Sequence, residues 1–318
     1  MTNPASQSIV LSNISEVERD TGVAKETLRV WERRYAFPLP LRDPNGERIY
    51  PEDQVQRLRL IKRLLDQGYR PGKIMHLDTD ALAELGAKCT PPAPLRGPSD
   101  PELALCLGLL KAHQMHELRQ RMAQAQLQMG LRTFVMEIVA PLTQMVGDAW
   151  AAGQLAVFEE HLYLETLQSV MRNAIFAATQ HGSHATARPR ILLTTVPLER
   201  HGLGLLMAEA LFALEGAHCV SLGVQTPLAE IVEAARIQRA DIVALSFSSV
   251  VSPRAAIDNV IELRSRLGET IQVWAGGSCA MAVRRQLGPH CVLDLNDITG
   301  AIGRWLAQHA AAQAVVPA

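Results

Sequence analysis

The sequence predicts a multidomain protein of α and α/β class. We expect an N-terminal winged helix-turn-helix, a helical bundle, and a C-terminal flavodoxin-like (Rossmann-like) parallel sheet. Three observations support this. A helix-glycine-helix unit and a hairpin open the chain, a long stretch with helical apolar periodicity follows, and apolar strands then alternate with helices. The expected domains cover residues 1–80, 102–182 and 188–312, with a linker over residues 88–101.

The overall composition excludes several classes. The chain has 318 residues, of which 48% are apolar and 20% charged, an ordinary composition for a globular protein of two or three domains. It has neither an apolar run of about 18 residues nor a signal-like leader, so we expect a cytoplasmic protein without a membrane partner. Its five cysteines show neither metal-ligand spacing nor a disulfide framework.

The first segment has the pattern of a helix-turn-helix. Ser12 and Asn13 can cap a first helix that Gly22 ends, and a second helix over residues 24–34 turns Leu28 and Trp31 inward. A unit of this kind places its second helix in the major groove of DNA. The residues on the outward face of the second helix are Lys25, Thr27, Arg29 and Arg33.

A predicted wing follows the second helix. The run Asp43-Pro44-Asn45-Gly46 is a strong turn signal between two short strands, and a further helix runs from Pro51 to Leu65. The wing presents the side chains of Arg42, Arg48 and Tyr50.

Charge and motif together indicate a nucleic-acid partner for this segment. Residues 1–77 hold 13 Lys and Arg against 10 Asp and Glu, a balance of +3 in a chain of net charge −1. The run from Thr27 to Tyr35, followed by Arg48-Ile49-Tyr50 and Gly68-Tyr69, resembles the DNA-binding domain of the MerR family. The resemblance implies a homo-oligomer, a dimer or a tetramer, on a palindromic or repeated double-stranded operator. It also implies that DNA is contacted by Arg29, Arg33, Arg42, Arg48 and Tyr50. The alternative is a winged helix used only for protein contacts.

The middle of the chain predicts a linker and then helices. Five prolines between residues 88 and 101 favour an extended, semi-rigid linker. From residue 102 to about residue 180 the apolar stripes are helical, and the length fits about four helices. Pro141 is expected to kink or restart one of them.

The C-terminal part predicts a doubly wound sheet. Expected strands cover residues 190–196, 218–222, 241–247, 271–275 and 292–295, with helices between them. Small or polar clusters stand at the ends of three of these strands: Glu199-x-His201-x-x-Gly204, Ser246-Phe247-Ser248 and Gly276-Gly277. In an open α/β sheet ligands bind outside the carboxyl ends of the strands, so the clusters describe one pocket. Its glycines admit a large flat ligand, and its imidazole can bind a metal.

This spacing resembles the B12-binding domain of methionine synthase, of the mutases and of B12-dependent photoreceptor regulators. Glu199 replaces the usual Asp of that motif, and Ser248 replaces a Leu or Thr. The resemblance implies that His201 displaces the cobalamin's own base and binds cobalt, while Glu199 holds the other ring nitrogen or tunes it through solvent. It also implies that the nucleotide tail enters a slot near Gly204, lined by Ser246, Ser248, Gly276 and Gly277.

A further pattern lies where the last long helix begins. Trp150 is followed after nine residues by Glu160 and His161, and Val157 shares their helix face. The pattern resembles the light-sensing, adenosylcobalamin-dependent repressors of the CarH kind, which implies that Trp150 covers the adenosyl group and Glu160 hydrogen-bonds to it. Those repressors have a His directly after the Trp, which binds cobalt after light has removed the adenosyl group. This chain has Ala151 there.

The sequence therefore predicts a transcriptional regulator, not an enzyme, whose DNA affinity depends on cobalamin, as adenosylcobalamin, and responds to light. Ala151 leaves two variants open. Either His161 binds cobalt in the lit state, or the chromophore is a bilin or haem, with Cys279 as an attachment point for a bilin. Two other hypotheses are a corrinoid-carrier component of an enzyme and a regulator whose vestigial B12 fold only oligomerises.

Overall fold

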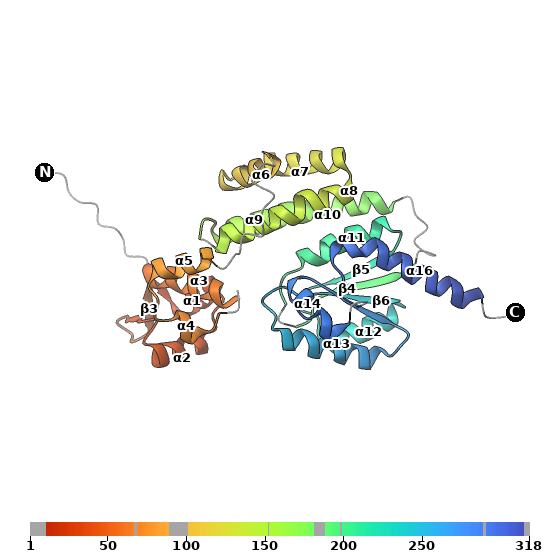
Figure 1. The fold of residues 1–318 in the computed structure, drawn as a ribbon. Coiled ribbons are helices and arrows are strands. Elements are labelled where there is room, and N and C mark those ends of the chain that lie inside the picture. The colour runs from red at the N-terminus through yellow and green to blue at the C-terminus, as the bar shows by residue number, and fades with distance from the viewer. Residues whose placement is uncertain are drawn as a thin grey trace. The chain divides into compact units, whose positions relative to one another are not determined.

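A computed structural model describes residues 11–66, 69–88, 101–151, 153–180, 188–197, 199–288 and 291–314. It confirms the predicted fold class (Figure 1). Internal contacts divide the described chain into two compact units. One unit comprises the residues up to 88 together with 148–155, and the other comprises the rest. The proline-rich segment predicted as a linker falls almost wholly on residues 89–100, outside the described residues.

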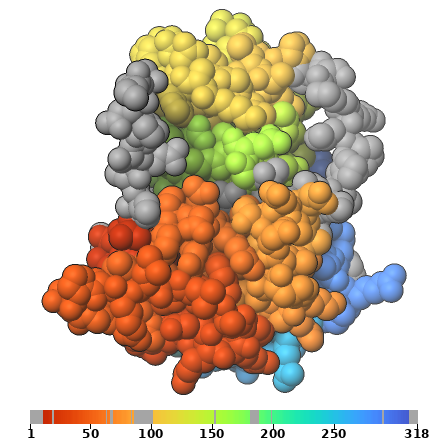
Figure 2. Space-filling model, turned by 90° about the vertical axis from the view of Figure 1, so that its left-hand side faces the viewer, coloured from red at the N-terminus to blue at the C-terminus, as the bar shows by residue number. Residues whose placement is uncertain are grey.

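The first unit contains a winged helix-turn-helix, here called the head. Asn13 caps the first helix by accepting hydrogen bonds from the backbone N–H groups of Ser15 and Glu16, and Gly22 ends that helix with a φ of 68°. Figure 2 shows the head, red to orange, as a closely packed body. Its elements are β1 (Leu11–Asn13), α1 (Ile14–Thr21), α2 (Lys25–Tyr35), β2 (Leu41–Arg42), β3 (Arg48–Pro51), α3 (Glu52–Asp66), α4 (Pro71–Ile74) and α5 (Thr79–Lys88).

The wing has one strand more than the sequence predicts. Its sheet has the order β1-β3-β2, with both outer strands antiparallel to β3. Three residues before α1 form β1 and pair with residues 49–51. Because β3 is central, its side chains are more buried than those of a two-stranded hairpin would be.

Five helical segments and a π-helical turn form the layer that precedes the parallel sheet. They are α6 (Pro101–Lys111), α7 (Met115–Met129), α8 (Leu131–Thr133), the π-helical η1 (Phe134–Val139), α9 (Ala140–Ala151) and α10 (Val157–Thr179). The predicted irregularity at Pro141 is the π-helical turn directly before it. Proline cannot donate to the carbonyl four residues earlier, and the wider turn relieves that conflict without ending the helix.

The parallel sheet has the order β5-β4-β6-β7 and carries helices on both faces. On one face α11 packs with α16, and α10 of the helical layer packs on α11; α12 and α13 cover the other face (Figure 1). The elements are β4 (Arg190–Thr194), α11 (Leu203–Leu214), β5 (His218–Gly223), α12 (Leu228–Ile237), β6 (Ile242–Ser246), α13 (Pro253–Leu267), β7 (Gln272–Gly276), α14 (Ser278–Ala282), α15 (Arg284–Leu287), the 3-10 turn η2 (Leu295–Asp297) and α16 (Ile298–Ala314).

The prediction of a fifth strand over residues 292–295 is wrong. Only Val292 bridges to the sheet, opposite Ala275. The Asp294 side chain accepts a hydrogen bond from the Asn296 backbone and starts η2, so the chain turns away at once. None of the helices in the described part of the chain is long and apolar enough to cross a membrane.

Candidate functional site

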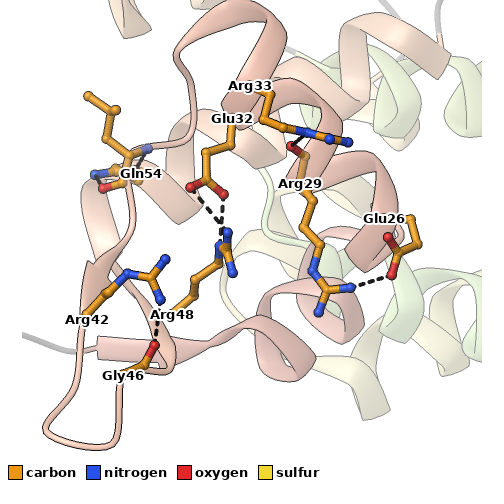
Figure 3. A network of polar contacts seen from close by, with 9 residues as sticks. Glu26, Arg29, Glu32, Arg33, Arg42, Gly46, Arg48 and Gln54 are labelled. Atoms are coloured by element: carbon orange, nitrogen blue, oxygen red, sulfur yellow. Dashed lines mark hydrogen bonds and ion pairs between the residues drawn. The ribbon is translucent and has the colours of Figure 1, made fainter.

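The outward face of α2 carries the predicted DNA-contacting side chains. Arg33 is exposed, and Lys25, Thr27 and Arg29 are partly exposed, while Leu28 and Trp31 anchor the helix in the core. Several of these cations have acidic partners in the head. Arg29 pairs with Glu26 (Figure 3), and Lys25 lies 3.6 Å from Glu18. The face is therefore basic but partly neutralised.

The wing places its two predicted arginines differently. Arg42 is exposed and donates to the Gly46 carbonyl at 2.7 Å. Arg48 reaches back to α2, where its Nε lies 2.8 Å from Glu32 Oε2 (Figure 3). Tyr50, predicted as a DNA contact, is fully buried in the head core, and burial raises its pKa. The physical reason is the alternation of side chains along β3: Tyr50 lies two residues after Arg48, on the face that packs against the helices, so it joins the core and does not reach the surface.

At the carboxyl edge of the parallel sheet, Glu199 holds His201 in place. Glu199 is fully buried. Its Oε1 lies 2.7 Å from His201 Nδ1 and accepts the His201 backbone N–H at 2.9 Å, while its Oε2 accepts the Ser248 backbone N–H at 2.7 Å. Burial alone would raise the pKa of Glu199, but the hydrogen bonds from His201 and Ser248 outweigh it and lower the pKa overall. The carboxylate therefore joins the loops that follow β4 and β6.

This contact sets the chemistry of the imidazole. With the carboxylate charged, Nδ1 carries the ring proton and donates a hydrogen bond to Glu199. A metal would therefore bind through Nε2. The His201 side chain is 56% exposed, so the ring extends to the surface although its anchor is buried. Ser248 Oγ lies 3.2 Å from Nδ1 and adds a second polar contact. Ser248 therefore supports the histidine, a different place from the tail slot that the sequence predicts.

A cavity of about 280 Å³ lies beside this edge, between α11 and the ends of β6 and β7. Four predicted residues line it: Gly204, Ser246, Gly276 and Gly277. A Cβ atom at Gly204 would lie 2.8 Å from Ser246 Oγ. The absence of a side chain at this glycine therefore allows helix and strand to approach at the cavity wall.

The apolar walls of this cavity and a buried threonine beneath the site are not among the residues predicted from the sequence. The walls include Leu205, Met207, Phe212, Trp274, Met281 and Ile298. Thr195 is fully buried; its Oγ1 donates to the Glu199 carbonyl at 2.6 Å and accepts the Gln225 N–H at 2.8 Å. Thr194 ends β4 and Thr195 follows it. These adjacent threonines are the sequence signal for this contact, because buried hydroxyl groups at the end of a strand need hydrogen-bond partners.

The helical-layer candidates lie around the end of α9 and the first turns of α10. Trp150 is partly buried near the end of α9. Val157 begins α10, and Glu160 is partly buried while His161 is exposed. The neighbouring Glu159, which the sequence reasoning passed over, accepts the Ala156 backbone N–H at 2.6 Å and contacts His113 Nε2 at 2.8 Å. Glu159 therefore fixes the start of the helix that carries the candidates.

We expect Glu159→Gln to weaken the start of α10 in a pH-dependent way. The backbone hydrogen bond and then His113 lower the pKa of Glu159, so its stabilisation is present at neutral pH. It is lost as the pH falls below about 4.3 and through the lowered folded-state value. Urea unfolding should show a deficit of about 1 kcal/mol in the free energy of unfolding at neutral pH and none in strong acid. A matched control is Glu165→Gln, on an exposed position of the same helix. An equal loss in both variants would contradict this role.

Comparison with known families identifies the classes of domain. Residues 13–80 match the MerR HTH family regulatory protein model. Residues 102–174 and 189–293 match two B12 binding domain models. The chain thus joins a MerR helix-turn-helix domain to B12-binding domains, the organisation of a transcriptional regulator with a corrinoid site.

Two curated relatives match this chain over most of their length. The HTH-type transcriptional repressor CarH of Myxococcus xanthus is 28% identical over 275 residues, 85% of this chain and 90% of the relative. The HTH-type transcriptional repressor CarA of the same organism is 29% identical, over 83% of this chain and 85% of the relative. The structure of the Methanosarcina barkeri monomethylamine corrinoid protein aligns with a TM-score of 0.49 at 13% identity, covering 61% of this chain and 93% of that one.

The residues present fit a cobalamin on structural grounds. A single imidazole with its Nδ1 fixed by a buried carboxylate is a suitable axial ligand for a metal already held by a macrocycle. The adjacent apolar cavity, with glycines at the strand ends, suits a flat aromatic base.

Proposed function

We propose that the protein is a cytoplasmic transcriptional regulator whose affinity for operator DNA is set by a cobalamin at the carboxyl edge of the parallel sheet. One observation carries the proposal. His201, anchored on the buried Glu199, stands beside a cavity lined by Gly204, Ser246 and the Gly276-Gly277 turn, in the same chain as a winged helix-turn-helix.

Each residue of the sheet edge has a distinct part in this proposal. His201 Nε2 binds the metal, and Glu199 keeps the proton on Nδ1 and the ring in one orientation. Ser248 fixes the carboxylate through its backbone N–H. Ser246 and the glycines admit the nucleotide tail to the cavity. When bound with an adenosyl group, cobalamin supplies a cobalt–carbon bond that light can break.

Residues of the helical layer support the parts of the proposal that concern the adenosyl form and the response to light. Trp150 and Glu160 have the spacing of the light-sensing, adenosylcobalamin-dependent repressors described above. The exposed His161 is a second imidazole that could bind the metal after illumination. Cofactor binding changes DNA affinity only if the cofactor has different affinities for two states of the protein. In this proposal the two states are different assemblies of the heads in a dimer or tetramer.

The side chain of Cys279 weighs against a bilin. It is only 5% exposed, and burial followed by the nearby Glu199 raises the pKa of its thiol. A buried thiol with a raised pKa is a poor nucleophile, so covalent attachment of a bilin there is unfavourable. This supports cobalamin over the bilin alternative.

The test is a DNA-binding measurement on the full chain, using a duplex selected by the protein from a randomised pool. We expect adenosylcobalamin in the dark to change the affinity for that duplex by about tenfold or more, and illumination to reverse the change. Protein without cofactor, given the same light, serves as the control. Equal affinities with and without cofactor, dark and lit, would remove the regulatory proposal even if the cofactor binds.

A further inference from the structure

An ion pair fastens the wing to the recognition helix in the head. Arg48 on β3 donates from Nε to Glu32 Oε2 at 2.8 Å, and its Nη2 lies 3.5 Å from Glu32 Oε1 (Figure 3). The two side chains are 28% and 25% exposed, so the pair is partly shielded from water. A two-point contact of this kind fixes both position and orientation of a guanidinium group.

The register of the wing explains why Arg48 needs a partner. Arg42 lies directly opposite Arg48 in the antiparallel ladder between β2 and β3. Like charges at directly opposed positions repel. Glu32 neutralises Arg48, and Arg42 turns to the Gly46 carbonyl. The pairing therefore permits two arginines to stand side by side in the wing while one of them remains exposed.

A second anchor holds the beginning of the wing. The Gln54 side chain accepts the Leu39 backbone N–H at 2.7 Å and donates to the Leu39 carbonyl at 2.8 Å (Figure 3). The wing is thus tied to α3 before β2 and to α2 through β3.

The other acidic residue on α2 has a different environment. Glu26 pairs with Arg29 one turn along the same helix, and their side chains are 79% and 43% exposed. Exposed pairs on one helix contribute little and exchange readily. A DNA phosphate can therefore displace Glu26 from Arg29 more easily than it can displace Glu32, which is less exposed and contacts Arg48 at two points.

We propose that Glu32 is a positioning residue for DNA binding. It holds Arg48 as a structural link between wing and recognition helix, so that Arg42 and Arg29 contact DNA while Arg48 does not. This inference rests on the proposed DNA-binding function. It also reassigns Arg48, which the sequence places among the direct contacts.

A charge exchange tests the proposal, with the duplex selected from a randomised pool by the unaltered full-length chain. Glu32→Gln and Arg48→Met should each weaken binding by about tenfold, and the double exchange Glu32→Arg with Arg48→Glu should restore most of it. If Arg48 instead contacts a DNA phosphate, the double exchange should not restore binding, because it would place a carboxylate against DNA. An exchange variant that folds, by circular dichroism, but binds as weakly as the single variants overturns the proposal.

The salt dependence of binding gives an independent readout that does not need the exchange variant. Arg42→Met should reduce the slope of log affinity against log salt by about 0.9, the value for one lost phosphate contact, whereas Arg48→Met should leave the slope unchanged. Equal slope losses for the two would overturn the proposal.

Glu26→Gln is the matched control for Glu32→Gln, and it should strengthen DNA binding. If both variants bind DNA more tightly than the unaltered chain, Glu32 is only an unfavourable charge and the proposal is overturned. Failure of the unaltered chain to select any duplex would refute the DNA-binding function itself.

Discussion

Replacing His201 with alanine is expected to weaken cobalamin binding by more than about 100-fold. Loss of an outer-shell partner alone typically costs about 10- to 100-fold in metal affinity, and this change removes the proposed ligand itself. The remaining cavity could still take an aromatic base, so weak binding should persist. Equilibrium dialysis of the purified protein against adenosylcobalamin in the dark measures the effect.

The matched control is His116→Ala, which removes an exposed imidazole from α7. We expect it to bind cobalamin as the unaltered chain does. Circular dichroism should show that both variants are folded, since the His201 side chain is more than half exposed and contributes little to the core. Unchanged affinity in His201→Ala would show that the cofactor, if it binds, is held without this imidazole.

Gly277→Ala is expected to destabilise the α/β domain severely and to abolish cofactor binding. The backbone of Gly277 has a φ of 91° and a ψ of 170°, a region occupied almost only by glycine, and forcing another residue there costs about 1–3 kcal/mol. A Cβ atom at this position would also lie 2.4 Å from the Phe247 carbonyl oxygen. That oxygen accepts the Cys279 backbone N–H, so it cannot move away freely. Urea unfolding should show a loss of more than about 3 kcal/mol in the free energy of unfolding.

Gly268→Ala separates the two causes. Gly268 has a similar backbone, with a φ of 73° and a ψ of −162°, but nothing lies within 4 Å of its Cβ position. Its replacement should cost only the conformational strain of about 1–3 kcal/mol and leave cobalamin binding intact. Equal losses for the two variants would mean that the close approach to Phe247 has no energetic weight.

The positions of the strand-end residues at one edge of the sheet could be predicted because they follow from topology. Parallel strands end at one edge, so the positions of His201, Ser246 and Gly276 along the chain were sufficient to predict that they lie near one another. The position of Ser248 was not predictable in the same way. Its contact with His201 depends on the path of the loop after β6, and on the extra methylene that lets Glu199 reach two loops.

The errors in the head and in the last strand arise where the apolar pattern alone does not decide the structure. Whether Tyr50 is exposed depends on which face of β3 packs against the helices, and a four-residue strand with one buried position does not reveal that face. Residues 292–295 are apolar enough for a strand, but the Asp294 cap and the η2 turn end the pairing after one residue. Packing against distant helices decides the burial of Tyr50, and a local polar cap ends the strand after Val292. Neither effect can be seen in the apolar pattern.

The central claim is that His201 of this chain binds the metal of a corrinoid, and electron paramagnetic resonance of the cobalt(II) form tests it most directly. An axial nitrogen splits the cobalt lines, and the multiplicity depends on the nitrogen isotope. Protein labelled with ¹⁵N-histidine and loaded with unlabelled cobalamin should show doublets, and His201→Ala should lose them. Triplets in the labelled protein would show that the cofactor's own base remains on the metal, and would contradict the account.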